Sequence, residues 1–152
     1  MWFMNKITNP IVRLILRSRL YRLLSSSLLL ISYRGRKSGK EYTLPVQYAQ
    51  TGNYIYILPG MPEQKTWWRN LKAGASVRVT LAGQTVAGSG KLLEPESELE
   101  TIVKGFDLYL QRFPALAKSF QVGSDTTGLF KDGDLRAACA GLVMIQVELG
   151  QK

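Results

Sequence analysis

Residues 28–58 read LLLISYRGRKSGKEYTLPVQYAQTGNYIYIL, and this stretch decides the fold. Its apolar runs at 28–33, 42–49 and 54–58 are separated by a cationic, glycine-containing turn and by Gly52-Asn53. Short runs of apolar, β-branched and aromatic residues between such turns are typical of strands. The stretch therefore predicts three successive strands joined by tight turns.

The rest of the chain adds further strands and several helices. Residues 66–73 predict a short helix, and residues 76–81 and 84–93 predict a hairpin around Ala82-Gly83. We expect a helix over 95–109, a second short helix ending near 120, a loop over 122–136 and a final strand over 142–149. About six strands with peripheral helices predict an α+β fold, an antiparallel barrel that forms one domain over 1–152.

Charge is unevenly distributed along the chain. Nine Lys and Arg residues precede Glu41, which is the first acidic residue, and the rest of the chain is neutral, so the net charge of +9 lies in the first 40 residues. Such a gradient favours an anionic partner, namely a membrane surface, a nucleic acid or a phosphorylated ligand. A basic face that only keeps the protein soluble is the alternative.

Residues 9–24 predict an amphipathic basic helix, with Asn9 as its N-cap and Pro10 in the first turn. Arginines interrupt its apolar residues every few positions, so we expect neither a signal peptide nor a membrane span. The helix either lies on an anionic membrane or packs across the barrel with its arginines reaching water.

The composition excludes several kinds of chemistry. The chain has no histidine and a single cysteine, Cys139, which we expect to be buried. This removes histidine-based triads and imidazole metal sites, and we predict no metal site and no catalytic side chain. We then expect a bound cofactor, or electrostatic effects, to carry any reaction.

Two segments are candidates for binding that cofactor. The turn at residues 34–40 contains two glycines, a serine and four cations, a composition suited to binding phosphate through backbone N–H groups and charge. A basic hairpin without a ligand is the simpler interpretation, and the spacing does not match a P-loop. Further along, Trp67 and Trp68 point about 100° apart on a helix, so one can enter the core while the other borders a pocket.

Taken together, Gly35-Arg36-Lys37-Ser38-Gly39, a strand containing Pro45 and then Trp67-Trp68-Arg69-Asn70-Leu71 resemble the deazaflavin-dependent nitroreductase family. The resemblance covers residues 9–93. It implies an FMN-binding split-barrel-like fold and a flavin/deazaflavin oxidoreductase that passes hydride from reduced coenzyme F420 to a quinone, a nitroaromatic compound or a similar small acceptor. It also implies the cofactor-binding residues, which are Arg36, Lys37, Ser38, Gly39, Pro45, Gln47, Trp67, Trp68 and Asn70.

Some positions depart from the family pattern. Lys40-Glu41 stands where the family often has an arginine, Gln47 where it often has a tyrosine, and residues 59–62 form a shorter loop. An FMN-dependent reductase and a non-catalytic carrier of lipid, flavin or haem therefore remain alternatives. The resemblance further implies a cytoplasmic protein, peripheral on the inner membrane face and able to form a homodimer. The candidate walls of the acceptor pocket are Tyr48, Tyr109, Phe113 and Phe120, and core packing is the favoured alternative for each of them. Nucleic-acid binding is disfavoured, because the N-terminal cations lie among leucines without a known motif.

Overall fold

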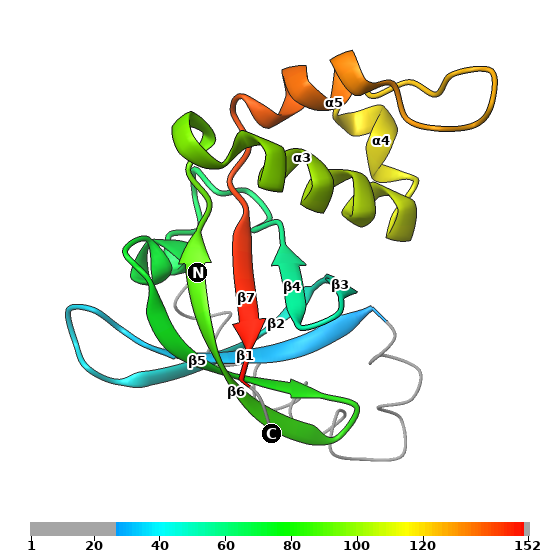
Figure 1. Ribbon diagram of the computed structural model, residues 1–152. Coiled ribbons are helices and arrows are strands. Elements are labelled where there is room, and N and C mark those ends of the chain that lie inside the picture. The colour runs from blue at the N-terminus through cyan, green and yellow to red at the C-terminus, as the bar shows by residue number, and fades with distance from the viewer. Residues whose placement is uncertain (1–26, 151–152) are drawn as a thin grey trace.

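The computed structural model describes residues 27–150, which form one curled sheet with helices gathered at one end (Figure 1). The strands are β1 (Leu28–Arg34), β2 (Glu41–Gln47), β3 (Ala49–Thr51), β4 (Tyr54–Ile57), β5 (Ala75–Leu81), β6 (Gln84–Leu92) and β7 (Ile145–Leu149). The helices are the short 3-10 helix η1 (Trp67–Leu71), α3 (Pro95–Arg112), α4 (Leu116–Ser119) and α5 (Asp132–Cys139).

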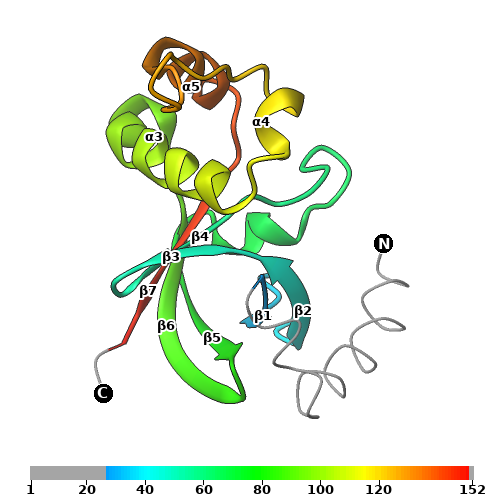
Figure 2. The same ribbon diagram turned by 90° about the vertical axis from the view of Figure 1, so that its right-hand side faces the viewer.

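The strands pair in the order β2-β1-β5-β6-β7-β4-β3, and every pairing is antiparallel. The two outermost strands, β2 and β3, are separated in sequence by Tyr48 alone. Because one residue spans only about 3.3–3.6 Å, the two edges of the sheet must come together at Tyr48. The sheet therefore curls into a barrel, and Figure 2 shows the chain passing from β2 into β3. The predicted antiparallel barrel is confirmed.

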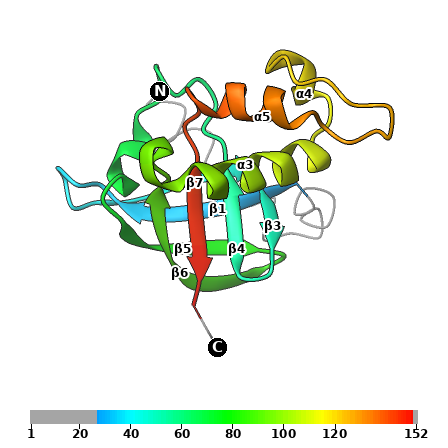
Figure 3. The ribbon, with the colours of Figure 1, turned by 45° about the horizontal axis from the view of Figure 1, so that its top comes forward.

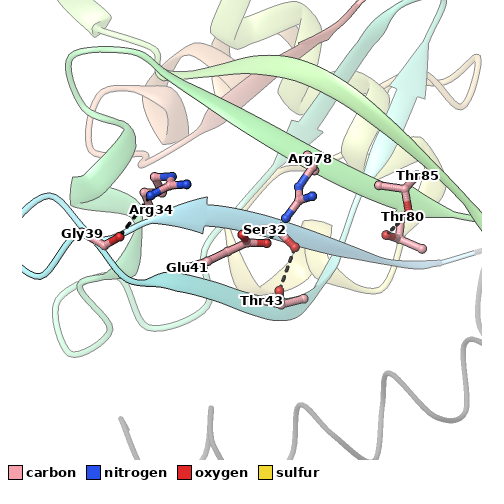
Figure 4. Close-up of polar contacts among 8 residues, drawn as sticks. All are labelled: Ser32, Arg34, Gly39, Glu41, Thr43, Arg78, Thr80 and Thr85. Carbon is pink, nitrogen blue, oxygen red and sulfur yellow. Dashed lines mark hydrogen bonds and ion pairs between the residues drawn. The ribbon is translucent and has the colours of Figure 1, made fainter.

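Alternation along the strands separates the barrel interior from its outer face. Leu29, Ile31 and Tyr33 of β1 are buried in the interior cluster, where strands β4, β5 and β7 also contribute aliphatic side chains. The outer face carries several polar pairs: Ser32 Oγ lies 2.7 Å from Thr43 Oγ1, and neighbouring polar pairs are drawn in Figure 4. Period-two alternation places Leu29, Ile31 and Tyr33 on the interior face and thereby fixes the strand register. Leu30 points to the opposite face and is also buried, at 3% exposed.

Helix α3 covers one end of the barrel, with α4 and α5 beyond it (Figure 3). Its buried face forms a second core with residues that include Tyr56 of β4 and Met144 just before β7. Close contact occurs at Gly105, where an added Cβ would lie 2.6 Å from Cδ1 of Tyr56 and 3.0 Å from Sδ of Met144. Only a residue without a side chain fits between α3 and the sheet at this point.

The structure corrects several predicted elements. Residues 27–150 contain seven strands instead of six, because residues 42–49 bend at Tyr48 and divide into β2 and β3. The predicted loop over 122–136 was wrong at its end, since α5 begins at Asp132. The residues predicted as an N-terminal helix, 9–24, lie outside the described part of the chain. No helix within residues 27–150 has the length and apolar character needed to cross a membrane.

Replacing Gly105 with valine tests the packing of α3. We expect Gly105→Val to lower the free energy of unfolding in urea by about 1–3 kcal/mol, because the side chain overpacks against Tyr56 and Met144. Lys104→Val is the control: it adds the same β-branched residue to the same helix at an exposed position, and should change stability by about 0.5 kcal/mol or less. Equal effects of the two variants would contradict the close contact.

Candidate functional site

A cleft of about 600 Å³ opens beside the edge strand β2. Its walls come from five parts of the fold: Tyr33 near the end of β1, the β1–β2 turn, β2 itself, the segment from residue 58 through η1, and Tyr109 of α3. The lining residues are Tyr33, Gly35, Arg36, Lys37, Ser38, Tyr42, Leu44, Pro45, Val46, Gln47, Leu58, Pro59, Gly60, Gln64, Lys65, Thr66, Trp67, Asn70 and Tyr109. The cationic turn and the tryptophan segment thus border one cavity.

The cationic turn between β1 and β2 has a defined shape. The Gly35 N–H donates to the Lys40 carbonyl and the Gly39 N–H donates to the Gly35 carbonyl, each at 2.8 Å. Gly39 has a φ of +70°, a conformation that side chains disfavour. A Cβ at Gly35 would lie 2.8 Å from both Ser38 Oγ and Cε2 of Tyr42. Both glycines are therefore required by the local geometry of the turn.

Asn70 ties this turn to η1. Its side-chain Oδ1 accepts a 2.8 Å hydrogen bond from the backbone N–H of Arg36, and its Nδ2 donates to the Trp67 carbonyl at 2.8 Å. One amide thus joins two segments that are 34 residues apart. The predicted contact of Asn70 with the cofactor stays a prediction. In the structure, the Asn70 side chain holds the turn in place relative to the tryptophan segment.

The turn presents donors and charge without neutralising partners. Within residues 27–150, the backbone N–H groups of Lys37 and Ser38 donate no hydrogen bond, and Ser38 Oγ lies 3.2 Å from the Tyr42 hydroxyl. Arg36, Lys37 and Lys65 all line the cleft, and none of them forms an ion pair with another described residue. No Asp or Glu is among the lining residues. This arrangement suits an anionic ligand group.

The adjacent tryptophans have different environments. Trp67 is 9% exposed, lines the cleft and lies 5.8 Å from the Tyr33 ring, centroid to centroid. Trp68 does not line the cleft: its Nε1 donates a 3.0 Å hydrogen bond to the Pro62 carbonyl, and the Arg69 guanidinium lies 5.4 Å from its ring centroid. Trp67 therefore forms part of the cleft wall, whereas Trp68 holds the preceding loop in place.

Tyrosines form much of the remaining wall. The Tyr33 ring stacks on the Tyr42 ring at 5.8 Å, and burial, with a smaller effect of Tyr42, raises the pKa of Tyr33 to about 12. Burial likewise raises the pKa of Tyr109 to about 12. Both phenols are thus protonated at neutral pH and can donate hydrogen bonds. The cleft combines an anion-binding end with an apolar aromatic surface.

Seven of the nine residues predicted to bind the cofactor line this cleft, and Gly39 and Trp68 do not. Their contacts with a cofactor remain predictions. Lys65 and Tyr33 line the cleft but were not predicted; Lys65 directly precedes the Thr-Trp-Trp motif, which was the available signal. Of the four candidate acceptor walls, only Tyr109 lines the cleft, and Phe120 packs on Phe106 in the second core. No cluster of potential metal ligands occurs among the residues described.

Comparison with known proteins adds the family context. The sequence model of a family described as F420H(2)-dependent quinone reductase matches residues 16–110. A solved structure described as an F420-H2 dependent reductase (FDR-A) has a TM-score of 0.55 and 18% identity over 82% of this chain and 94% of that one. Another, described as a domain-swapped dimer, has a TM-score of 0.54 and 18% identity over 93% and 99%. No curated protein matched the sequence. The structural likenesses confirm the predicted split β-barrel fold.

Replacing Asn70 with alanine tests the tie between the turn and η1. We expect Asn70→Ala to lower the free energy of unfolding by about 0.5–1.5 kcal/mol, since the Arg36 N–H and the Trp67 carbonyl each lose their hydrogen bond to the Asn70 side chain. Hydrogen exchange of the Arg36 amide should become faster. Asn53→Ala, in the exposed β3–β4 turn, is the control and should leave that amide unchanged; an equally slow Arg36 amide in Asn70→Ala would refute the tie.

Proposed function

The chain belongs to the F420H2-dependent quinone reductase family, and we propose that the cleft beside β2 holds the reduced cofactor next to a quinone acceptor. Membership makes the protein an F420-dependent oxidoreductase that acts on a small-molecule acceptor. Among the alternatives left open by the sequence, it favours F420 over FMN and an enzyme over a non-catalytic carrier.

The observation that carries the proposal is the cation set of the cleft. Arg36, Lys37 and Lys65 face one cavity that no carboxylate lines, and the N–H groups of Lys37 and Ser38 have no partner within residues 27–150. F420 bears a phosphate and a carboxylate-rich tail, and each charge-assisted hydrogen bond to such a group contributes about 1.5–3 kcal/mol. We therefore assign the β1–β2 turn and Lys65 to the cofactor tail.

The aromatic part of the cleft suits a flat ring system. Trp67 and Tyr33 supply apolar faces, and Pro45 and Val46 supply the neighbouring part of the β2 edge. Pro45 is accommodated because β2 pairs only with β1 and is an outermost strand of the sheet. When bound there, reduced F420 supplies a hydride, and the protein contributes binding, orientation and exclusion of water.

Neutralising the turn should weaken cofactor binding. We expect Arg36→Ala/Lys37→Ala to raise the dissociation constant for F420, measured by quenching of its fluorescence, at least about tenfold, because two charge-assisted contacts are lost. Lys65→Ala should give a smaller loss. The control Lys72→Ala/Lys118→Ala removes the same charge from exposed positions outside the cleft.

If only the net charge of the protein mattered, both double variants would lose the same affinity for F420. The comparison therefore separates a local contact of the turn from a general electrostatic attraction. Unchanged affinity in Arg36→Ala/Lys37→Ala, or an equal loss in the control, would rule out the turn as the site of the anionic tail. The Arg36→Ala/Lys37→Ala variant should fold normally, since the glycine hydrogen bonds that shape the turn do not involve these side chains.

Cellular location and pairing are further parts of the proposal. The concentration of the whole net charge of +9 in the first 40 residues supports a cytoplasmic protein held on the anionic inner face of the membrane, where quinones are dissolved. A solved structure of the same fold is described as a domain-swapped dimer, which supports a homodimer. The mass of the purified protein in light scattering tests the pairing.

Co-sedimentation with vesicles tests the membrane contact. The full chain should sediment with vesicles that contain anionic lipid and remain in solution with neutral ones, and added salt should release it. Arg13→Gln/Arg17→Gln should bind the anionic vesicles several-fold more weakly, since each basic residue near the surface contributes about 1 kcal/mol. Equal sedimentation with neutral and anionic vesicles would contradict a charge-based contact.

A further inference from the structure

Tyr109 is a buried residue whose hydroxyl forms no hydrogen bond with the residues that the structure describes. It is the residue that α3 contributes to the cleft, it is 2% exposed, and its ring lies 5.0 Å from the Phe113 ring, centroid to centroid. Among residues 27–150, no hydrogen bond involves its hydroxyl. By contrast, the buried Tyr56, which lies outside the cleft, accepts a hydrogen bond at its hydroxyl from Gln146 Nε2 at 3.3 Å.

A hydroxyl without a partner is unfavourable in a buried position, because it loses its hydrogen bonds to water and gains none from the protein. Phenylalanine would supply the same ring to the contact with Phe113 without that cost. Packing among the described residues thus gives the Tyr109 hydroxyl no role, and Tyr109 is a residue of the cleft wall, beside the space that a ligand would occupy.

Tyr33 also lines the cleft with a hydroxyl that has no hydrogen bond to the described residues, but its ring has an evident role between Tyr42 and Trp67. Tyr109 comes from a different element, the helix that closes one end of the barrel. It is therefore placed on the helical wall of the cleft, whereas Arg36 and Lys37 belong to the turn.

We propose that the Tyr109 hydroxyl donates a hydrogen bond to a carbonyl oxygen of the acceptor and so selects acceptors that carry one. This inference rests on the proposed function. Burial holds the pKa of Tyr109 near 12, so the phenol keeps its proton and acts as a donor. The acceptor gains two electrons and one proton as hydride from reduced F420, and its second proton comes from water, so the phenol is not consumed.

The variant Tyr109→Phe removes the hydroxyl and keeps the ring. Protein loaded with oxidised F420 is titrated with menadione, a naphthoquinone, in a calorimeter, so that binding is measured without turnover. We expect the dissociation constant for menadione to rise about fivefold to tenfold, as for loss of one hydrogen bond, while that for F420 stays within twofold. In turnover, KM for menadione should rise more than kcat falls.

A phenazinium dye, which accepts hydride but has no carbonyl oxygen, separates the proposed contact from a general distortion of the cleft. Its reduction by Tyr109→Phe should match that of the unaltered protein. An equal loss with the dye and with menadione would overturn the carbonyl contact, and so would unchanged menadione binding.

Thermal stability gives a readout that is independent of activity. Tyr109→Phe should melt at the same temperature as the unaltered protein or higher, since it removes a buried hydroxyl that has no hydrogen-bond partner within residues 27–150. The matched variant Tyr56→Phe should melt lower, because it breaks the contact with Gln146, and should bind menadione normally. A lower melting temperature for Tyr109→Phe would show that its hydroxyl has a structural partner and would overturn the inference. Failure of the unaltered protein to bind F420 would instead refute the proposed function.

Discussion

The hydrogen bond from the Arg36 backbone N–H to the Asn70 side chain connects the two halves of the site. The β1–β2 turn extends from the sheet, and its own hydrogen bonds define its shape but not its direction. Asn70 fixes that direction relative to η1, whose Trp67 is buried in the barrel core. Since the cationic groups and the aromatic wall are thereby held in one geometry, the cleft is preorganised before a ligand arrives.

The cations of the cleft are arranged for binding and not for stability. Arg36 and Lys37 are adjacent, Lys65 lines the same cavity, and the four ion pairs among the described residues involve other side chains. The ion pair of Arg78 with Glu41, for instance, reaches across β1 on the outer face of the barrel (Figure 4). Positive charges kept together without carboxylates repel one another, and a bound anion relieves that repulsion. Departures of this kind from the most stable arrangement are expected at functional sites.

The sequence was sufficient to predict features that depend on local chemistry. The turn at residues 34–40 and the hairpin at Ala82-Gly83 follow from glycines and strand alternation, and both are present. The division at Tyr48 was missed, because a bend between two edge strands needs neither glycine nor proline. Helix α5 was missed because Asp132, Gly133 and Asp134 in its first turn resemble loop composition. Asp residues there instead complement the helix dipole.

Features that depend on contacts between distant parts of the chain could not be predicted from the sequence. The partner of Asn70 lies 34 residues upstream, so its role in orienting the turn had no local signal. Lys65 became part of the site only through the path of the loop before η1. For Tyr109, helical periodicity indicates burial but gives no information on whether its hydroxyl finds a partner. The family resemblance supplied the connection between the turn and the tryptophan segment, and seven of its nine predicted residues line one cleft.

Titration of the purified protein with F420 and with the same deazaflavin ring system lacking the phosphate-bearing tail tests most directly whether the turn binds that tail. If it does, the tail-free compound should bind at least about a hundredfold more weakly at low salt, given several charge-assisted contacts. The difference should shrink as the ionic strength rises. Equal affinity of the two compounds at low salt would contradict the assignment of the β1–β2 turn to the cofactor tail.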